Sequence, residues 1–135
     1  MASRLAPLFD RSVGRGVVSA YLFGSRVRGG AHRESDVDVG VLLDRGRFPQ
    51  RLDRSRARID LLSEAIATLN RNEVDLVILN DLPPRFARTV LQGELLFCRD
   101  SEAEFAFRLR TQLLAADLDV FMRRMDRIKL EALRS

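Results

Sequence analysis

The sequence of 135 residues has one cysteine, no tryptophan, one histidine and one tyrosine. A lone cysteine, Cys98, excludes an internal disulfide and a zinc site made of several cysteines, and it fits a reducing cytosol. No apolar run approaches the roughly 20 residues that a membrane-spanning helix needs. The first residues also lack the unbroken apolar segment of a secretory signal peptide. We therefore expect a cytoplasmic protein that does not enter a membrane.

Lysine is almost absent as well. Lys129 is the only one, so arginine supplies nearly all of the 23 positive side chains, which face 19 acidic ones. The planar guanidinium group favours phosphates and carboxylates, which would suit a nucleic-acid binder. No aromatic platform accompanies the basic residues, however. An arginine-rich solvated surface therefore explains the charge better than direct binding of nucleic acid.

The apolar residues alternate between helical and strand periodicity, and the length fits a single domain over residues 1–135. The expected order is a helix over 3–12, strands over 17–23 and 37–43, a helix over 50–69, a strand over 74–79, a short helix from 81–84 to 93, a strand over 94–98 and a long helix over about 101–133. This order predicts a mixed α/β (α+β) fold, with a small mixed four-strand sheet flanked by helices.

Two details of these helices can be predicted further. In the helix over 50–69 the apolar residues at helical spacing mark the expected buried face: Leu52, Ile59, Leu62, Ile66 and Leu69. The pattern Ser101-x-x-Glu104 is that of a capping box and would open the final helix. Tyr21 and Cys98 are expected to pack within their strands. The final helix has more apolar positions than one stripe on a four-strand sheet needs, which leaves a partner surface and core packing as alternatives.

The segment between the first two strands carries the chemistry. Gly24-Ser25 closes the first strand, and Asp36-x-Asp38 opens the second. Residues i and i+2 of a strand share a face, so Asp36 and Asp38 would stand side by side and repel unless a cation neutralises them. Such hard oxygen ligands suit Mg²⁺. Gly24 lets backbone N–H groups approach an anion, and Ser25 adds a hydroxyl donor. The pattern predicts a site for a nucleotide and metal ions.

A third carboxylate is needed to complete a two-metal site and to take a proton from an attacking hydroxyl. Asp75, on a separate strand of the same predicted sheet, is the candidate, with a solvated position at the strand end as the alternative. Arg26 and Arg28 either contact the departing phosphates or are solvated loop residues. His32 fits a surface residue better than a catalyst.

These residues resemble the nucleotidyltransferase superfamily that includes DNA polymerase beta. The match is best for its minimal nucleotidyltransferase (MNT) branch, which includes antitoxins of HEPN–MNT toxin–antitoxin pairs. Two motifs carry the resemblance, which covers most of the chain: Gly24-Ser25 through Asp36-Val37-Asp38, and Val74-Asp75-Leu76-Val77, followed by Asn80 and Gly93-Glu94-Leu95-Leu96-Phe97. Ile78 departs from the pattern, because relatives often carry another acidic residue there.

The resemblance implies a role for each matching residue. Asp36 and Asp38 would bind two Mg²⁺ ions, and Asp75 would bind one and help to activate the acceptor hydroxyl. Gly24 and Ser25 would hold the triphosphate. The acceptor oxygen would attack the α-phosphate of ATP, and pyrophosphate would leave. The implied acceptor is a hydroxyl of a cognate HEPN toxin ribonuclease, silenced by the transfer.

Two other functions remain open at this stage. The protein could neutralise the toxin by binding alone, with a vestigial nucleotide site. It could also transfer a nucleotide to a small molecule, although that class usually has an added substrate-binding domain. The sequence names neither the acceptor nor the oligomeric state.

Overall fold

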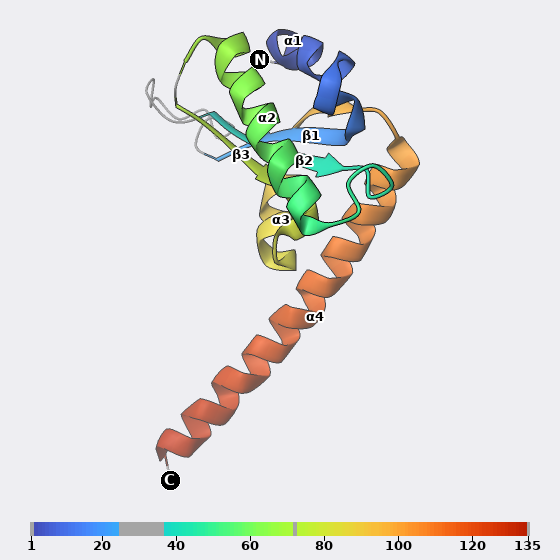
Figure 1. The fold of residues 1–135 in the computed structure, drawn as a ribbon. Coiled ribbons are helices and arrows are strands. Elements are labelled where there is room, and N and C mark those ends of the chain that lie inside the picture. Colours follow the sequence, from blue (N-terminus) through green and yellow to red (C-terminus); the bar gives the residue numbers. More distant parts are fainter. Residues whose placement is uncertain (1, 25–36, 72, 135) are drawn as a thin grey trace.

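The computed structural model describes residues 2–24, 37–71 and 73–134. Within them four strands form one sheet in the order β3-β2-β1-β4 (Figure 1). The strands are β1 (Val17–Phe23), β2 (Val37–Leu43), β3 (Val74–Ile78) and β4 (Glu94–Cys98). β1 pairs antiparallel with β2 and with β4, whereas β2 and β3 are parallel. The predicted mixed sheet is confirmed.

The parallel pair determines the position of the main helix. Parallel neighbours need a crossover connection, and here α2 (Arg51–Leu69) supplies it between β2 and β3. α2 and the N-terminal helices cover one face of the sheet, with Leu8, Phe9 and Leu61 fully buried against the strands. The predicted range of the helix is confirmed, with Gln50 as its N-cap.

The buried face of α2 differs in part from the prediction. Ala57, Leu61, Ala65 and Leu69 face the core, whereas Leu52 and Ile59 are 59% and 60% exposed. Ala57 and Ala65 point toward the sheet, and their small side chains let the helix axis lie close to it, with Leu61 and Leu69 buried on the same side. Of the five residues predicted for this face, Leu69 is buried and Leu62 and Ile66 pack partly buried against the core, so the prediction is wrong for Leu52 and Ile59.

The first helix is also shorter than predicted. α1 spans only Ala2–Leu5, and two 3₁₀ helices follow, η1 (Ala6–Asp10) and η2 (Ser12–Gly16). Pro7 explains the break, because within a continuous α-helix it would lack one N–H donor and clash with the carbonyl four residues earlier. By starting a new helix at Ala6, the chain places Pro7 in a first turn, where proline is tolerated.

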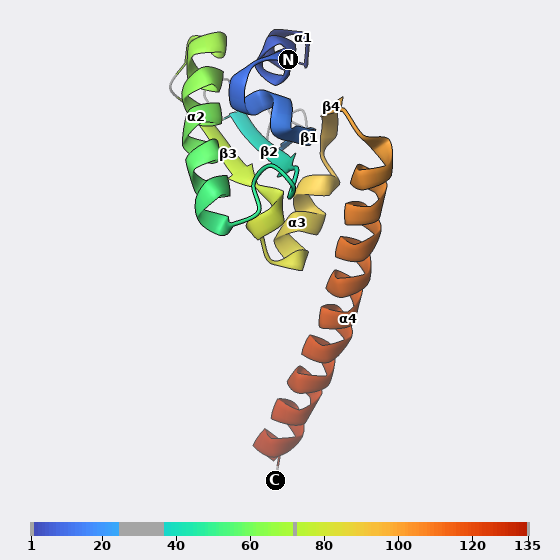
Figure 2. The ribbon, with the colours of Figure 1, turned by 45° about the vertical axis from the view of Figure 1, so that its right-hand side comes forward.

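α3 (Pro84–Leu91) and the first half of α4 (Ser101–Arg134) cover the opposite face (Figure 2). α3 lies very close to β2, since a Cβ on Gly40 would stand 2.4 Å from Val90 Cγ1. The capping-box prediction for α4 is wrong. Asp100 Oδ1 accepts the bond from Ala103 N at 3.1 Å, while Glu104 instead binds Arg108 at 2.9 Å.

Beyond α3, α4 projects away from the sheet (Figures 1 and 2). Asp119 ties it to α3 through Arg88 at 2.8 Å and Arg85 at 3.0 Å, and Arg88 lowers the pKa of the Asp119 carboxyl. Only Glu104, Thr111 and Ala115 of this helix are buried. Its exposed large apolar residues include Phe105, Leu109, Leu113, Leu114, Val120, Phe121, Met122, Ile128, Leu130 and Leu133. Core packing therefore does not account for them.

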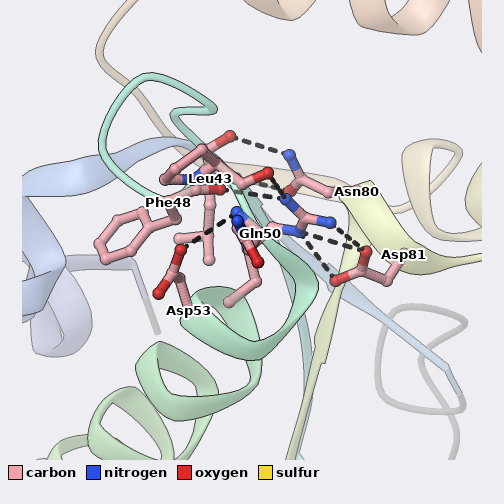
Figure 3. Close-up of polar contacts among 8 residues, drawn as sticks. Leu43, Phe48, Gln50, Asp53, Asn80 and Asp81 are labelled. Atoms are coloured by element: carbon pink, nitrogen blue, oxygen red, sulfur yellow. Dashed lines mark hydrogen bonds and ion pairs between the residues drawn. The ribbon is translucent and has the colours of Figure 1, made fainter.

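Arg54 connects the start of α2 to the end of β3. Its guanidinium donates to Asp81 Oδ1 at 2.8 Å and to Phe48 O at 3.0 Å (Figure 3). Beside it, Asn80 donates to Leu43 O and accepts from Leu43 N, both at 2.9 Å. The side chain of Asn80 thus makes the two hydrogen bonds to the Leu43 backbone that another residue of β3 would otherwise make. For this reason β3 ends at Ile78, and Leu79–Asp81 form the 3₁₀ helix η3 rather than more strand.

Tyr21 lies under α4 and is fully buried, as predicted, whereas Cys98 is exposed on β4. Arg108 stands 5.7 Å from the centre of the Tyr21 ring. Burial penalises the phenolate and raises the pKa of Tyr21 from 10.0 to about 12. The neutral hydroxyl is therefore part of the folded state.

This burial has a measurable consequence at high pH. The folded state keeps a proton that the unfolded state releases, so the free energy of unfolding should fall as pH rises from 10.0 to about 12. With one tyrosine and no tryptophan, the near-ultraviolet absorbance of phenolate reports this residue alone. Tyr21→Phe should flatten the pH dependence. A phenolate signal with an ordinary midpoint while the circular dichroism of the fold is unchanged would contradict this account.

Candidate functional site

Two of the predicted carboxylates lie on neighbouring strands. Asp38 of β2 is the register partner of Asp75 of β3, and on its other side it is the partner of Phe23 at the end of β1. Neighbouring strands are about 4.8 Å apart and paired residues share a face. Asp38 and Asp75 therefore belong to the same face of the sheet. Each is the second residue of its strand, so they lie at the end of the sheet where β2 and β3 begin.

Gly24 brings the backbone against the first of these carboxylates. Its φ is +89°, a left-handed conformation that favours glycine. A Cβ at this position would stand 2.4 Å from Asp38 Oδ2. The turn at Gly93 holds this end of β1 from the other side, because a Cβ there would stand 2.2 Å from Leu22 O. Gly24 lets the backbone approach the Asp38 carboxylate, and Gly93 lets a second segment approach the Leu22 carbonyl of β1.

Asp75 has a partner that sequence reasoning missed. Arg58 of α2 donates from Nε to Leu76 O at 2.7 Å, and its Nη2 lies 3.5 Å from Asp75 Oδ1. The Asp75 side chain is 53% exposed, so its carboxylate is open to solvent as well as to Arg58. The spacing of Arg51, Ser55 and Arg58 along one side of α2 was the available signal, but the arginines were interpreted as a solvated surface.

The other predicted residues, Ser25, Arg26, Arg28, His32 and Asp36, lie outside the described residues. Within residues 2–24, 37–71 and 73–134, no group of three or more His, Cys, Asp or Glu side chains forms a metal site. The two described carboxylates fit a hard divalent cation, since they are adjacent oxygen ligands at an open edge. A side chain on residue 24 would meet Asp38 Oδ2, so only glycine lets the backbone lie this close to that carboxylate.

Gly24→Ala should therefore impair the site more than the fold. The added methyl group would meet Asp38 Oδ2, and the left-handed backbone would cost about 1 kcal/mol. We expect at least tenfold weaker nucleotide-dependent activity, while the circular dichroism stays native. Gly46→Ala is the matched control, because the nearest atom there is 3.4 Å away in an exposed turn. Equal effects of the two substitutions on activity would contradict the role of Gly24.

The mixed four-strand sheet agrees with the nucleotidyltransferase fold that the sequence predicts. Residues 7–102 match the family model described as Polymerase beta, Nucleotidyltransferase. This match covers more than half of the chain, and the chain belongs to that family. A search of curated proteins gives no match.

Solved structures share the fold over nearly the whole chain. A mutant form of the toxin–antitoxin MntA–HpeT matches with a TM-score of 0.72 at 22% identity, over 96% of this chain and 98% of that one. A toxin–antitoxin crystallised with AMP-PNP gives 0.70 at 23% identity, over 96% and 98%. The complex of a tri-AMPylated Shewanella oneidensis HEPN toxin with its MNT antitoxin gives 0.67 at 21% identity, over 96% and 95%. The predicted nucleotidyltransferase family and fold are confirmed.

Proposed function

We propose that this protein is a Mg²⁺-dependent nucleotidyltransferase that transfers AMP from ATP to a hydroxyl of a HEPN-domain toxin ribonuclease, and that it thereby acts as an antitoxin. The observation that carries the proposal is the register of Asp38 with Asp75 beside the turn at Gly24. The family match supports nucleotidyl transfer. The structural similarity to a complex with an AMPylated toxin supports the choice of acceptor.

No helix in the described part of the chain is long and apolar enough to cross a bilayer.

The residues divide the chemistry between them. Asp38 and Asp75, with Asp36 as the predicted third ligand, would hold two Mg²⁺ ions, which supply charge neutralisation at the phosphates when bound. Backbone N–H groups at Gly24 and the hydroxyl of Ser25 would hold the triphosphate, and Arg26 and Arg28 would contact the departing phosphates. Asp75 would accept the proton of the acceptor hydroxyl. The acceptor oxygen forms a bond to the α-phosphorus, and the bond to pyrophosphate breaks.

The stretch of α4 from Leu114 to Ile128 is the proposed toxin-binding surface. Leu114, Leu118, Phe121, Met125 and Ile128 recur at alternating intervals of four and three residues, which places them along one side of the helix. Leu114 and Phe121 are 50% and 54% exposed, and Ile128 is 51% exposed. A monomer rarely exposes such a continuous apolar stripe without a partner. An apolar helical surface of the toxin would bury it.

The test uses the purified protein, a candidate HEPN-domain toxin, Mg²⁺ and ATP labelled on the α-phosphate. We expect label on the HEPN protein and loss of its ribonuclease activity. The control is the variant with both Asp36→Ala and Asp38→Ala. No label on the toxin, or equal label from this variant, would overturn the proposal.

The exposed stripe on α4 also favours a second function, neutralisation of the toxin by binding alone. The same double variant separates the two functions in cells that express the toxin. Growth at the wild-type level would show that binding suffices. Failure to rescue, with the complex still isolated intact, would show that transfer is required.

A further inference from the structure

A groove runs along the open edge of β3, away from the glycine turn. Arg51, Ser55 and Arg58 of α2 line one side, and Val77 and Ile78 of β3 line the other. We call it the β3-edge groove; its volume is about 220 Å³. All of its residues lie in the described part of the chain. None of them belongs to the glycine turn or to the Asp36-x-Asp38 motif.

The β3-edge groove is positively charged. Asp81 lies at one end but is neutralised by Arg54, whose Nη2 is 2.8 Å from Asp81 Oδ1. Arg51 is exposed and has no ion-pair partner among the described residues. Within the described ranges Arg58 has one ion-pair partner, Asp75 at 3.5 Å, and its side chain is 40% exposed. Arg51 therefore faces solvent without an ion pair among the described residues, and Arg58 faces it with one long ion pair.

Arg58 connects the groove to the proposed general base. The same guanidinium that lines the groove bonds Leu76 O at 2.7 Å and lies 3.5 Å from Asp75 Oδ1. A charged side chain over an edge strand discourages the regular addition of another strand. A chain that enters the groove would therefore be recognised by its side-chain charge rather than by a continuous backbone ladder.

We infer that the β3-edge groove receives the segment of the acceptor protein that carries the modified hydroxyl, and that this segment is acidic. The inference rests on the proposed function. Arg51 and Arg58 are two helical turns apart, about 10 Å at 1.5 Å per residue. An extended chain covers that distance in about three residues. The geometry thus requires an acidic side chain about three positions from the hydroxyl. The groove has no aromatic residue among those that line it, so it lacks the stacking surface of a single-stranded RNA site.

The experiment compares Arg51→Glu with Arg56→Glu in the labelled-ATP assay with the HEPN-domain protein. Both arginines are exposed on α2 and have no ion pair among the described residues, but Arg56 does not line the groove. Arg51→Glu should raise the KM for the acceptor about fivefold, the size expected for losing a surface ion pair. Its kcat should stay within about twofold, as should both constants of Arg56→Glu. Changing the acidic acceptor residue to lysine should restore the KM of Arg51→Glu.

Equal KM values in the two variants would overturn the inference and leave the proposed function intact. Labelled single-stranded RNA that binds more weakly to Arg51→Glu than to Arg56→Glu would assign the groove to nucleic acid and also overturn it. Absence of transfer by the wild-type protein would instead remove the proposed function. Mg-ATP should raise the melting temperatures of both variants equally, because neither arginine lies at the glycine turn.

Discussion

Asp38→Asn should reduce the rate of the proposed AMP transfer by about three orders of magnitude, with little change in the fold. Asparagine keeps the shape of the side chain beside Gly24 but removes the negative charge that Asp38 contributes next to Asp75. A catalytic metal ion contributes several kcal/mol of charge stabilisation to the transition state, and about 4 kcal/mol corresponds to that factor in rate. Single-turnover transfer of labelled AMP to the HEPN-domain protein would measure it.

The control is Asp60→Asn, an exposed position on α2. It should leave the rate within about twofold, since surface substitutions away from a site rarely matter. Excess Mg²⁺ should recover part of the activity of Asp38→Asn, because the weaker site then fills by mass action. Retention of a tenth or more of wild-type activity by Asp38→Asn, without added Mg²⁺, would contradict a ligand role for Asp38.

Arg54→Met should lower the free energy of unfolding by about 3 kcal/mol. The side chains of Arg54 and Asp81 are only 11% and 18% exposed, and Arg54 also bonds the carbonyl of Phe48 at 3.0 Å. Removing one partner of a buried pair leaves the other charge buried and uncompensated, which costs roughly 3–5 kcal/mol. Urea unfolding would show a lower midpoint with an unchanged slope.

Two further variants separate the buried charge from the lost packing. Adding Asp81→Leu to Arg54→Met should recover part of the stability, because the unpaired carboxylate is then gone. Arg56→Met changes an exposed arginine of the same helix and should cost less than about 0.5 kcal/mol. A similar loss in Arg54→Met and Arg56→Met would show that the Arg54–Asp81 pair does not stabilise the fold.

The sheet could be predicted because its signals are local. Val17–Phe23 and Val37–Leu43 are β-branched or alternating runs bounded by glycine or polar residues, and the structure confirms both ranges. The register of Asp38 with Asp75 was not predictable in the same way. It depends on β2 and β3 being parallel neighbours, which local patterns do not report and the structure shows.

The errors have tertiary or short-range causes. The face of α2 was misjudged because burial depends on how closely Ala57 and Ala65 let the helix approach the sheet, which periodicity does not report. Asp100 caps α4 because a carboxylate one residue before Ser101 reaches Ala103 N. Arg58 was missed for a different reason. Its partners, Leu76 and Asp75, are distant in sequence, and an arginine on an exposed helix side usually has no specific contact.

The long reach of α4 has a consequence for the lifetime of the protein. After Asp119 the helix continues to Arg134, and its side chains there are almost all exposed. An isolated helix of about 12–15 residues is marginally stable in water. In a copy without a partner this arm should therefore unfold locally at little cost and offer a cleavage site to proteases. Copies made in excess of the partner would be trimmed first, so the cellular supply of the partner would set the steady-state amount of this protein.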